Sequence, residues 1–208
     1  NSLLFGVATV AVAVPMGLVV SVASTGEGRW RSLLETATML PFAVSGIVFG
    51  IGLLRGLVFG ISLPGGWRFV IAGGVAIVAA HAVAAYPFVT RLVTPALGGI
   101  DDRMTDAARS LGASRLRTLL DVELPLVAGA LVAGAAFAFA ISVGEFDSTV
   151  LLAEGVDSYT MPVALERYRG NRSIGPSLGP AMAMGTVLLA VTTVSFVLID
   201  RFGGRWEG

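Results

Sequence analysis

The sequence predicts an all-α, polytopic membrane protein with five transmembrane helices and a short helical loop between the third and the fourth. Two observations lead to this fold class. Hydrophobic residues make up 55% of the 208 residues and charged residues only 13%, whereas soluble domains carry about 25% charged residues. The few charges also leave five long stretches free of Asp, Glu and Arg. This composition excludes a disordered chain and argues against a water-soluble globule.

The five uncharged stretches cover residues 1–26, 36–54, 69–90, 124–144 and 173–199. A bilayer core needs about 20 apolar residues in helical form. In lipid the backbone must satisfy its own hydrogen bonds, which favours helices for such runs. None of the stretches shows the polar face of a soluble surface helix. We therefore expect transmembrane helices over residues 3–24, 38–60, 69–92, 126–146 and 178–199.

Arginine placement sets the orientation, because every basic residue of the chain is an arginine and basic residues favour cytoplasmic loops. With the N-terminus outside, nine arginines fall inside: Arg29, Arg31, Arg91, Arg103, Arg109, Arg115, Arg117, Arg201 and Arg205. Five fall outside: Arg55, Arg68, Arg167, Arg169 and Arg172. The predicted orientation places the loop between the third and fourth helices in the cytoplasm.

The second predicted helix carries a small-residue pair, Gly46 and Gly50, at the spacing that lets membrane helices approach closely. Glycine is also frequent in membrane helices in general, so both interpretations stay open here.

The loop after the third helix has the signals of a short helix with both ends specified. Asp101 is a good N-cap, Asp102 adds negative charge to the first turn, and Gly112 is a good C-terminal stop. One apolar stripe follows i, i+3, i+4, i+7 spacing: Met104, Ala107, Ala108 and Leu111. A second short helix follows, with Ser114 as its cap. Such a helix can lie in the lipid interface or fill a groove on a partner protein. Two of the four stripe residues are alanines, whose small side chains allow close approach to a protein groove, and this favours a protein partner over lipid.

The same loop resembles a known family. Permeases of ABC importers with the type I fold carry a cytoplasmic loop with E-A-A, three residues, G, nine residues, then I-x-L-P. This chain has Asp106-Ala107-Ala108, then Gly112, then Val122-Glu123-Leu124-Pro125 at the same spacing. Asp106 replaces Glu and Val122 replaces Ile, and both changes are conservative.

The resemblance extends over nearly the whole chain. Three further stretches are similar to iron-, thiamine- and sulfate-type permeases: residues 80–88 around His81 and Tyr86-Pro87, Ser142-Val143-Gly144-Glu145-Phe146, and Thr160-Met161-Pro162-Val163-Ala164. The resemblance implies one transmembrane permease domain over residues 1–208, with a cytoplasmic coupling loop over 101–125. Because such permeases often have a further upstream helix, and because the sequence starts at Asn1, we expect this domain to be part of a longer chain.

The resemblance also implies how the protein works. Cytoplasmic ATPase subunits would receive the coupling loop, an extracytoplasmic binding protein would deliver the substrate, and a second permease subunit or half would complete the path. The implied ATPase-docking residues are Asp102, Met104, Asp106, Ala107, Ala108, Leu111, Gly112, Leu124 and Pro125. The subgroup implies iron, thiamine, or an oxyanion such as sulfate or molybdate as substrate. The sequence contains no lysine and no G-x-x-x-x-G-K-[ST] loop, so ATP binding is assigned to the partner.

Three polar residues are candidates for the translocation path. His81, the only histidine, lies within the third uncharged stretch, Ser142 within the fourth, and Glu145 at the end of the fourth. Ionisable groups inside a membrane are costly and often functional. The alternative for His81 is a neutral ring bonded to another helix, and for Glu145 a solvated residue at the interface.

Other functions fit the sequence less well. A serine intramembrane protease would need G-x-S-G, but Ala43 stands where the first glycine belongs. A zinc enzyme would need H-E-x-x-H, which one histidine cannot form, and the absence of cysteine excludes thiolate sites. We therefore expect no enzyme, no cofactor and no resident metal. The 14 acidic and 14 basic residues balance, so the chain has no net positive charge that would attract nucleic acid. A secondary transporter or channel remains as the alternative, although no internal repeat is found.

Overall fold

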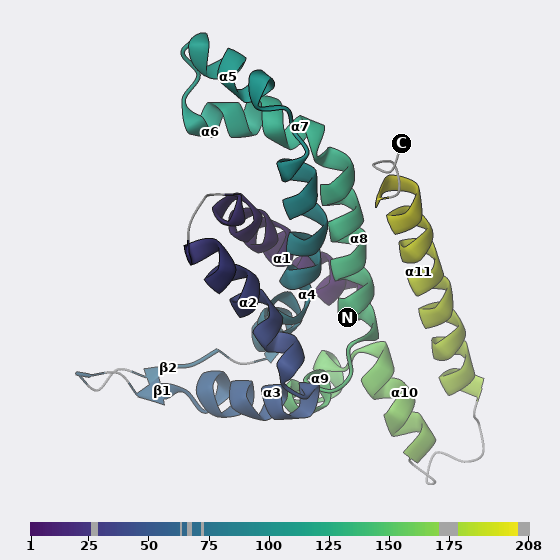
Figure 1. The fold of residues 1–208 in the computed structure, drawn as a ribbon. Coiled ribbons are helices and arrows are strands. Elements are labelled where there is room, and N and C mark those ends of the chain that lie inside the picture. Colours follow the sequence, from purple (N-terminus) through teal and green to yellow (C-terminus); the bar gives the residue numbers. More distant parts are fainter. Residues whose placement is uncertain (26–28, 63, 66–67, 72, 171–178, 204–208) are drawn as a thin grey trace.

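The computed structural model describes residues 1–25, 29–62, 64–65, 68–71, 73–170 and 179–203. Four long helices form the body of the molecule: α1 (Ser2–Ser24), α4 (Gly73–Gly98), α8 (Ala128–Gly144) and α11 (Gly179–Gly203). Helices α1, α4 and α8 pack against one another, and α11 lies along α8 (Figure 1). Arg172 and Arg205, which entered the orientation count, lie outside the described residues.

Three of the expected spans are single long helices. Among the described residues, α1, α4 and α11 are each long and apolar enough to cross a membrane. Helices α1 and α11 begin within one residue of the predicted starts, whereas α4 begins four residues later than predicted. The count of five is reached when each of two bent helix pairs is taken as one span.

The second expected span, residues 38–60, is wrong as one straight helix. The chain forms α2 (Arg29–Ala43), then α3 (Gly46–Leu53), which continues into the π-helix η1 (Leu54–Val58), and the two parts meet at 96°. Pro41 removes a backbone donor near the end of α2, and Ser45 leaves the helix with ψ of 139°. The uncharged stretch by itself does not indicate such a bend, because it reports only the absence of charged residues.

Beyond η1, two strands of two residues each pair antiparallel, β1 (Ile61–Ser62) and β2 (Arg68–Phe69). This small hairpin was not predicted from the sequence, and it projects from the bundle (Figure 1). We call this end of the molecule the hairpin end. It also carries α9 (Thr149–Leu152), the 3-10 turn η3 (Val156–Ser158) and α10 (Met161–Gly170).

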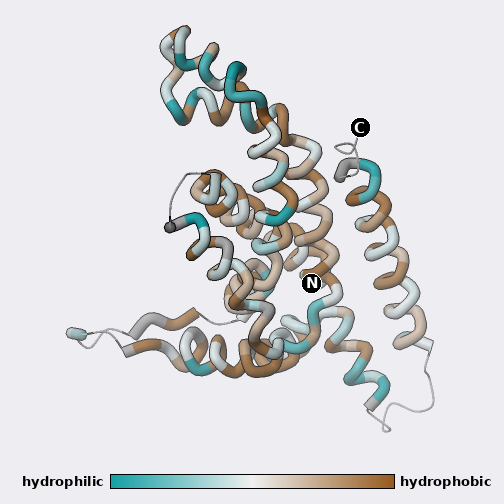
Figure 2. The backbone as a smooth tube through the Cα atoms, in the orientation of Figure 1, coloured by the Kyte–Doolittle hydropathy of each residue, from teal (hydrophilic) through white to brown (hydrophobic). Residues whose placement is uncertain are grey.

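The opposite end, which we call the loop end, carries the loop after α4. It consists of α5 (Asp102–Ser110), α6 (Arg115–Thr118), the π-helix η2 (Leu119–Glu123) and α7 (Leu124–Leu126). The run from α6 to α7 meets α8 at 76°. The long helices are mostly hydrophobic, while α5 and α6 are largely hydrophilic (Figure 2). This distribution supports a loop outside the membrane.

The packed core depends on small residues. Val89 of α4 is fully buried between two glycines, Gly17 of α1 and Gly134 of α8. A Cβ atom on Gly17 would lie 2.5 Å from Cβ of Val89, and one on Gly134 would lie 3.2 Å from Cγ1 of Val89. The two glycines therefore let three helices approach closely, as small residues do in membrane bundles.

Candidate functional site

The first candidate site is the exposed face of α5 at the loop end. The side chain of Asp101 accepts a hydrogen bond of 2.9 Å from the backbone N–H of Arg103, as predicted for the N-cap. At the other end, Gly112 has φ of +86°. The N–H of Ala113 bonds the carbonyl of Ala108 and the N–H of Gly112 bonds that of Arg109, which is a Schellman motif. Local signals in the sequence therefore fix both ends of α5.

The apolar stripe of α5 remains largely uncovered. Leu111 is 90% exposed, Met104 and Ala107 are also exposed, and Ala108 is half-buried. Asp102 and Asp106 lie in the exposed part of the same helix. Exposed apolar side chains on an otherwise hydrophilic helix mark a surface that a partner or lipid covers. Five of the predicted docking residues thus lie on α5, and Leu111 and Gly112 follow at its end.

The remaining docking candidates lie further along the loop. Ser114 caps α6 by accepting a bond from the N–H of Arg117, and the chain then runs through η2 to Leu124 and Pro125 in α7. Leu124 is half-buried and Pro125 is exposed. These two residues therefore stand next to the bend into α8, rather than beside the stripe of α5.

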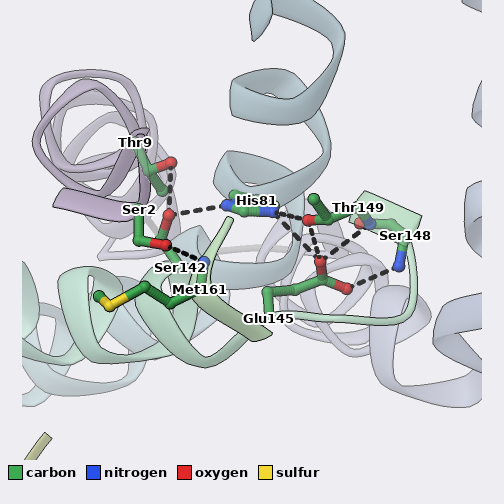
Figure 3. A network of polar contacts seen from close by, with 8 residues as sticks. All are labelled: Ser2, Thr9, His81, Ser142, Glu145, Ser148, Thr149 and Met161. Atoms are coloured by element: carbon green, nitrogen blue, oxygen red, sulfur yellow. Dashed lines mark hydrogen bonds and ion pairs between the residues drawn. The ribbon is translucent and has the colours of Figure 1, made fainter. Parts of the chain in front are cut away.

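The second candidate site is a buried polar network that contains all three predicted path residues (Figure 3). Nδ1 of His81 lies 2.7 Å from Oγ of Ser142, and Nε2 lies 3.1 Å from Oε2 of Glu145. His81 belongs to α4, Ser142 to α8, and Glu145 directly follows α8. The His81 side chain is fully buried and that of Glu145 is 15% exposed. His81 thus contacts two neighbouring residues, Ser142 and Glu145, that lie more than 60 positions further along the chain.

Two more hydroxyl groups complete the network. Oγ1 of Thr149 lies 2.7 Å from Nε2 of His81 and donates a hydrogen bond of 2.7 Å to Oε2 of Glu145. Oγ1 of Thr9, on α1, lies 3.1 Å from Oγ of Ser142. Because a hydroxyl has a single proton, Thr149 accepts from His81, so Nε2 carries a proton. Thr149 and Glu145 then share the single Nε2 proton, while Nδ1 can accept from Ser142 and Ser142 from Thr9.

Glu145 also holds the turn that follows α8. Its carboxylate accepts backbone hydrogen bonds from the N–H groups of Ser148 at 2.8 Å and Thr149 at 3.1 Å. These are the first N–H groups of α9, which have no partner within that helix. Leu152 at the end of α9 is fully buried against Ala76, Ile77 and Ala80 of α4. One carboxylate thus connects α4, α8 and the start of α9.

The other side of this turn packs on α3. A Cβ atom on Gly46 would lie 2.8 Å from Cβ of Asp147, and one on Gly50 would lie 3.0 Å from Cα of Ser148. Gly52 has nothing within 4 Å of such an atom. The close-packing interpretation is therefore confirmed for Gly46 and Gly50. We call residues 145–152 the clamped segment, because α3 and α4 hold it from two sides.

Sequence reasoning missed Thr9, Ser148 and Thr149. Thr9 could have been noticed as a hydroxyl within an uncharged stretch, but nothing in the sequence links it to Ser142. Ser148 and Thr149 follow Glu145 at the three- and four-residue spacing of a capping interaction. Among the described residues, no group of three or more His, Cys, Asp or Glu side chains could hold a metal ion.

The sequence is similar to those of known membrane transport proteins. The profile of the family described as "Binding-protein-dependent transport system inner membrane component" matches residues 10–208. The molybdenum transport system permease protein ModB of Escherichia coli (strain K12) is 28% identical over 188 residues, which cover 85% of this chain and 76% of ModB. The sulfate transport system permease protein CysT of the same strain is 32% identical over 187 residues, covering 86% of this chain and 66% of CysT.

Solved structures share the fold at low sequence identity. A chain of a bacterial ABC transporter involved in import of the acidic polysaccharide alginate has a TM-score of 0.72 and 14% identity, covering 100% of this chain and 78% of its own length. A chain of the inward-facing MetNI methionine ABC transporter has a TM-score of 0.68 and 18% identity, covering 98% and 89%. At these identities the likeness shows the fold alone.

Proposed function

The chain belongs to the family of binding-protein-dependent transport system inner membrane components. We propose that α5 is the helix that docks on the ATPase subunit and couples ATP hydrolysis to the membrane helices. The chain is a multi-pass protein of the cell membrane and a permease subunit of an ABC importer, not an enzyme. Family membership sets aside the alternative of a secondary transporter or channel. Partners of this family include an ATPase and a substrate-binding protein.

The exposed stripe of α5 is the observation that supports docking. A helix capped at both ends holds its shape outside the membrane, and its apolar side chains gain when a partner groove covers them. The proposed docking residues are Asp102, Met104, Asp106, Ala107, Ala108, Leu111 and Gly112, with Leu124 and Pro125 at the bend. Residues 101–125 would be the coupling loop of one permease domain spanning residues 1–208.

The proposed substrate is an oxyanion of the molybdate or sulfate class. Relatives named for molybdenum and for sulfate transport support this choice over iron and thiamine. The test is ATP-dependent uptake into proteoliposomes that contain the complete transporter and its binding protein. Labelled molybdate and sulfate are each compared with thiamine. Uptake of thiamine, with neither oxyanion accumulating, would reject the proposal.

A second permease subunit or half completes the proposed path. The chain presents one docking helix, whereas importers of this kind work with two ATPases. In α11 the buried residues whose side chains are described are Ala181 and Ser195. Most of that helix is therefore open to lipid or to another helix, which leaves room for a homodimer or a pseudo-dimer.

His81, Ser142 and Glu145 are proposed to serve the translocation path through positioning. His81 and Ser142 are buried and cannot meet a solute in this arrangement. Glu145 is the partly exposed member. Its role would be to keep the clamped segment in place at the hairpin end while the helices around it move.

A thiol crosslink tests docking directly. The chain has no cysteine, so Ala108→Cys introduces a single thiol within the stripe. Val156→Cys, at a residue that is 78% exposed at the hairpin end, is the matched control. In native membranes, a thiol-reactive crosslinker should join the ATPase subunit to Cys at position 108 and not at 156. Capture of lipid alone at position 108 would overturn the docking proposal.

A further inference from the structure

A hollow lies beside the loop, next to Arg109 of α5. It has a volume of about 540 Å³ and is bounded by the last turn of α1, by α5, and by the run from α6 to η2. Two arginines line it, Arg109 and Arg115, together with Glu123. The remaining wall is mainly apolar, with Val22, Leu116 and Leu119.

The two arginines are available for a ligand. Arg109 has one ion pair, to Asp106 at 3.9 Å, and both side chains are more than half exposed. Such surface pairs contribute little. Within the part of the chain that the structure describes, no ion pair of Arg115 is found. With Glu123 the hollow keeps one net positive charge, and guanidinium groups suit phosphate oxygens because they donate two parallel hydrogen bonds.

The position of the hollow matches the surface of a bilayer. Its α1 wall is the last turn of a helix that is long and apolar enough to span the membrane. One turn further into the span lies Val19, which is 68% exposed, and Met16 and Val12 continue an exposed apolar row along the same helix. A charged hollow at the end of an exposed apolar row can accommodate a lipid, with the headgroup in the hollow and an acyl chain along the row.

The hollow remains open when the stripe is covered. At 100° per residue, Arg109 lies on the side of α5 opposite the centre of the stripe formed by Met104, Ala107, Ala108 and Leu111. A partner that covers only these four apolar residues and a ligand between α5 and α1 would therefore occupy different faces, whereas Asp102 and Asp106 share the side of Arg109. Docking through the apolar stripe and ligand binding are thus compatible, and they can be measured separately.

We infer that this hollow binds the headgroup of an anionic phospholipid from the leaflet at the loop end, with the phosphate between Arg109 and Arg115. Basic pockets at the cytoplasmic side of membrane proteins recognise lipid phosphate in this way. The net charge of the hollow complements the single negative charge of phosphatidylglycerol, whereas phosphatidylcholine has no net charge. The bound lipid would tie α5 to the end of α1 and so stabilise the position of the loop.

Native mass spectrometry of the purified, delipidated transporter tests this inference. The complex is titrated with phosphatidylglycerol or phosphatidylcholine, and bound lipids are counted. The variants are Arg109→Gln, Arg115→Gln and the double variant. Arg117→Gln is the matched control, since Arg117 pairs with Asp121 on the exposed side of the same helix and does not line the hollow.

We expect one tightly held phosphatidylglycerol per permease subunit. Each arginine near the surface contributes about 1 kcal/mol, so affinity should fall about fivefold in each single variant and about thirtyfold in the double variant. The control should bind as the unmodified protein does. Equal retention in all variants, or equal binding of phosphatidylcholine, would overturn the inference.

Two additions separate this outcome from its alternatives. Inorganic phosphate at millimolar concentration should leave the lipid bound, because the acyl chain adds apolar contact; displacement by phosphate would assign the site to a soluble anion and overturn the lipid. The ATPase retained by each variant is measured in the same spectra. Retained ATPase with lost lipid supports the inference, while lost ATPase in the Arg115→Gln variant would place that arginine in the docking surface and overturn it.

Discussion

Nε2 of His81 lies 3.1 Å from Oε2 of Glu145, and Nδ1 of the same ring lies 2.7 Å from Ser142. One imidazole thus joins α8 at two points, one inside the helix and one just beyond its end. Both partners also bind a threonine, Thr9 for Ser142 and Thr149 for Glu145. The removal of Ser142 therefore leaves two buried polar groups, His81 Nδ1 and the Thr9 hydroxyl, without this partner, and the cost is measurable.

Ser142→Ala tests the network with the loss of one oxygen atom. The change leaves His81 Nδ1 and the Thr9 hydroxyl without their shared partner, so we expect a loss of about 1–3 kcal/mol in the free energy of unfolding. Ser24→Ala is the control: Ser24 is equally buried, but its hydroxyl bonds only the carbonyl of Val20 in its own helix. Thermal unfolding in detergent should separate the two variants. Equal stability of both variants would show that the network does not contribute to the free energy of unfolding.

Gly50→Ala tests the packing of α3 on the clamped segment. The new methyl group would meet Cα of Ser148 at 3.0 Å, which is backbone and cannot rotate away. We expect a loss of about 1–3 kcal/mol from overpacking. Gly52→Ala, in the same helix with open space around it, should be neutral or stabilise by up to about 1 kcal/mol, because alanine favours helix. A reversed order of the two variants in thermal unfolding would contradict the packing.

Leu111→Asp tests docking without disturbing the fold. The side chain is 90% exposed, so stability should change by less than about 0.5 kcal/mol. A charge within the stripe would have to be desolvated against the partner, and we expect at least about tenfold less ATPase to co-purify. Val156→Asp at the hairpin end is the control. Unchanged ATPase recovery with Leu111→Asp would exclude the stripe as the docking face.

Gly112→Ala tests the turn after α5. The site is open, but φ of +86° is unfavourable for a residue with a Cβ atom. We expect the variant to lose about 1–2 kcal/mol locally and to lower the substrate-stimulated ATPase rate of the assembled transporter. Gly98→Ala, also in open space but at the end of α4, is the comparison. If both variants retain full stimulation, the turn geometry does not matter for coupling.

The features that the sequence predicted correctly depend on local signals. Asp101 and Gly112 specify the ends of α5 through residues within one turn of themselves, and the uncharged stretches locate α1 and α11. The uncharged stretches did not locate the bend before Gly46, where Pro41 lacks a backbone donor and α3 packs on residues 147–151. The contacts of His81 were equally inaccessible, since their partners lie on α8 and α9. Both features are set by the tertiary arrangement.

The bend at Val127 has a mechanical consequence. Val127 is fully buried in the same apolar cluster as Val93 and Ala96 of α4, so the corner between the loop and α8 rests on a fixed support. The loop is the shorter segment on one side of this corner, and α8 is the longer segment on the other side. Helix α8 has 17 residues, about 25 Å. If the corner turns as a unit, a small tilt of the loop would produce a larger displacement at the far end of α8, where Glu145 holds the clamped segment.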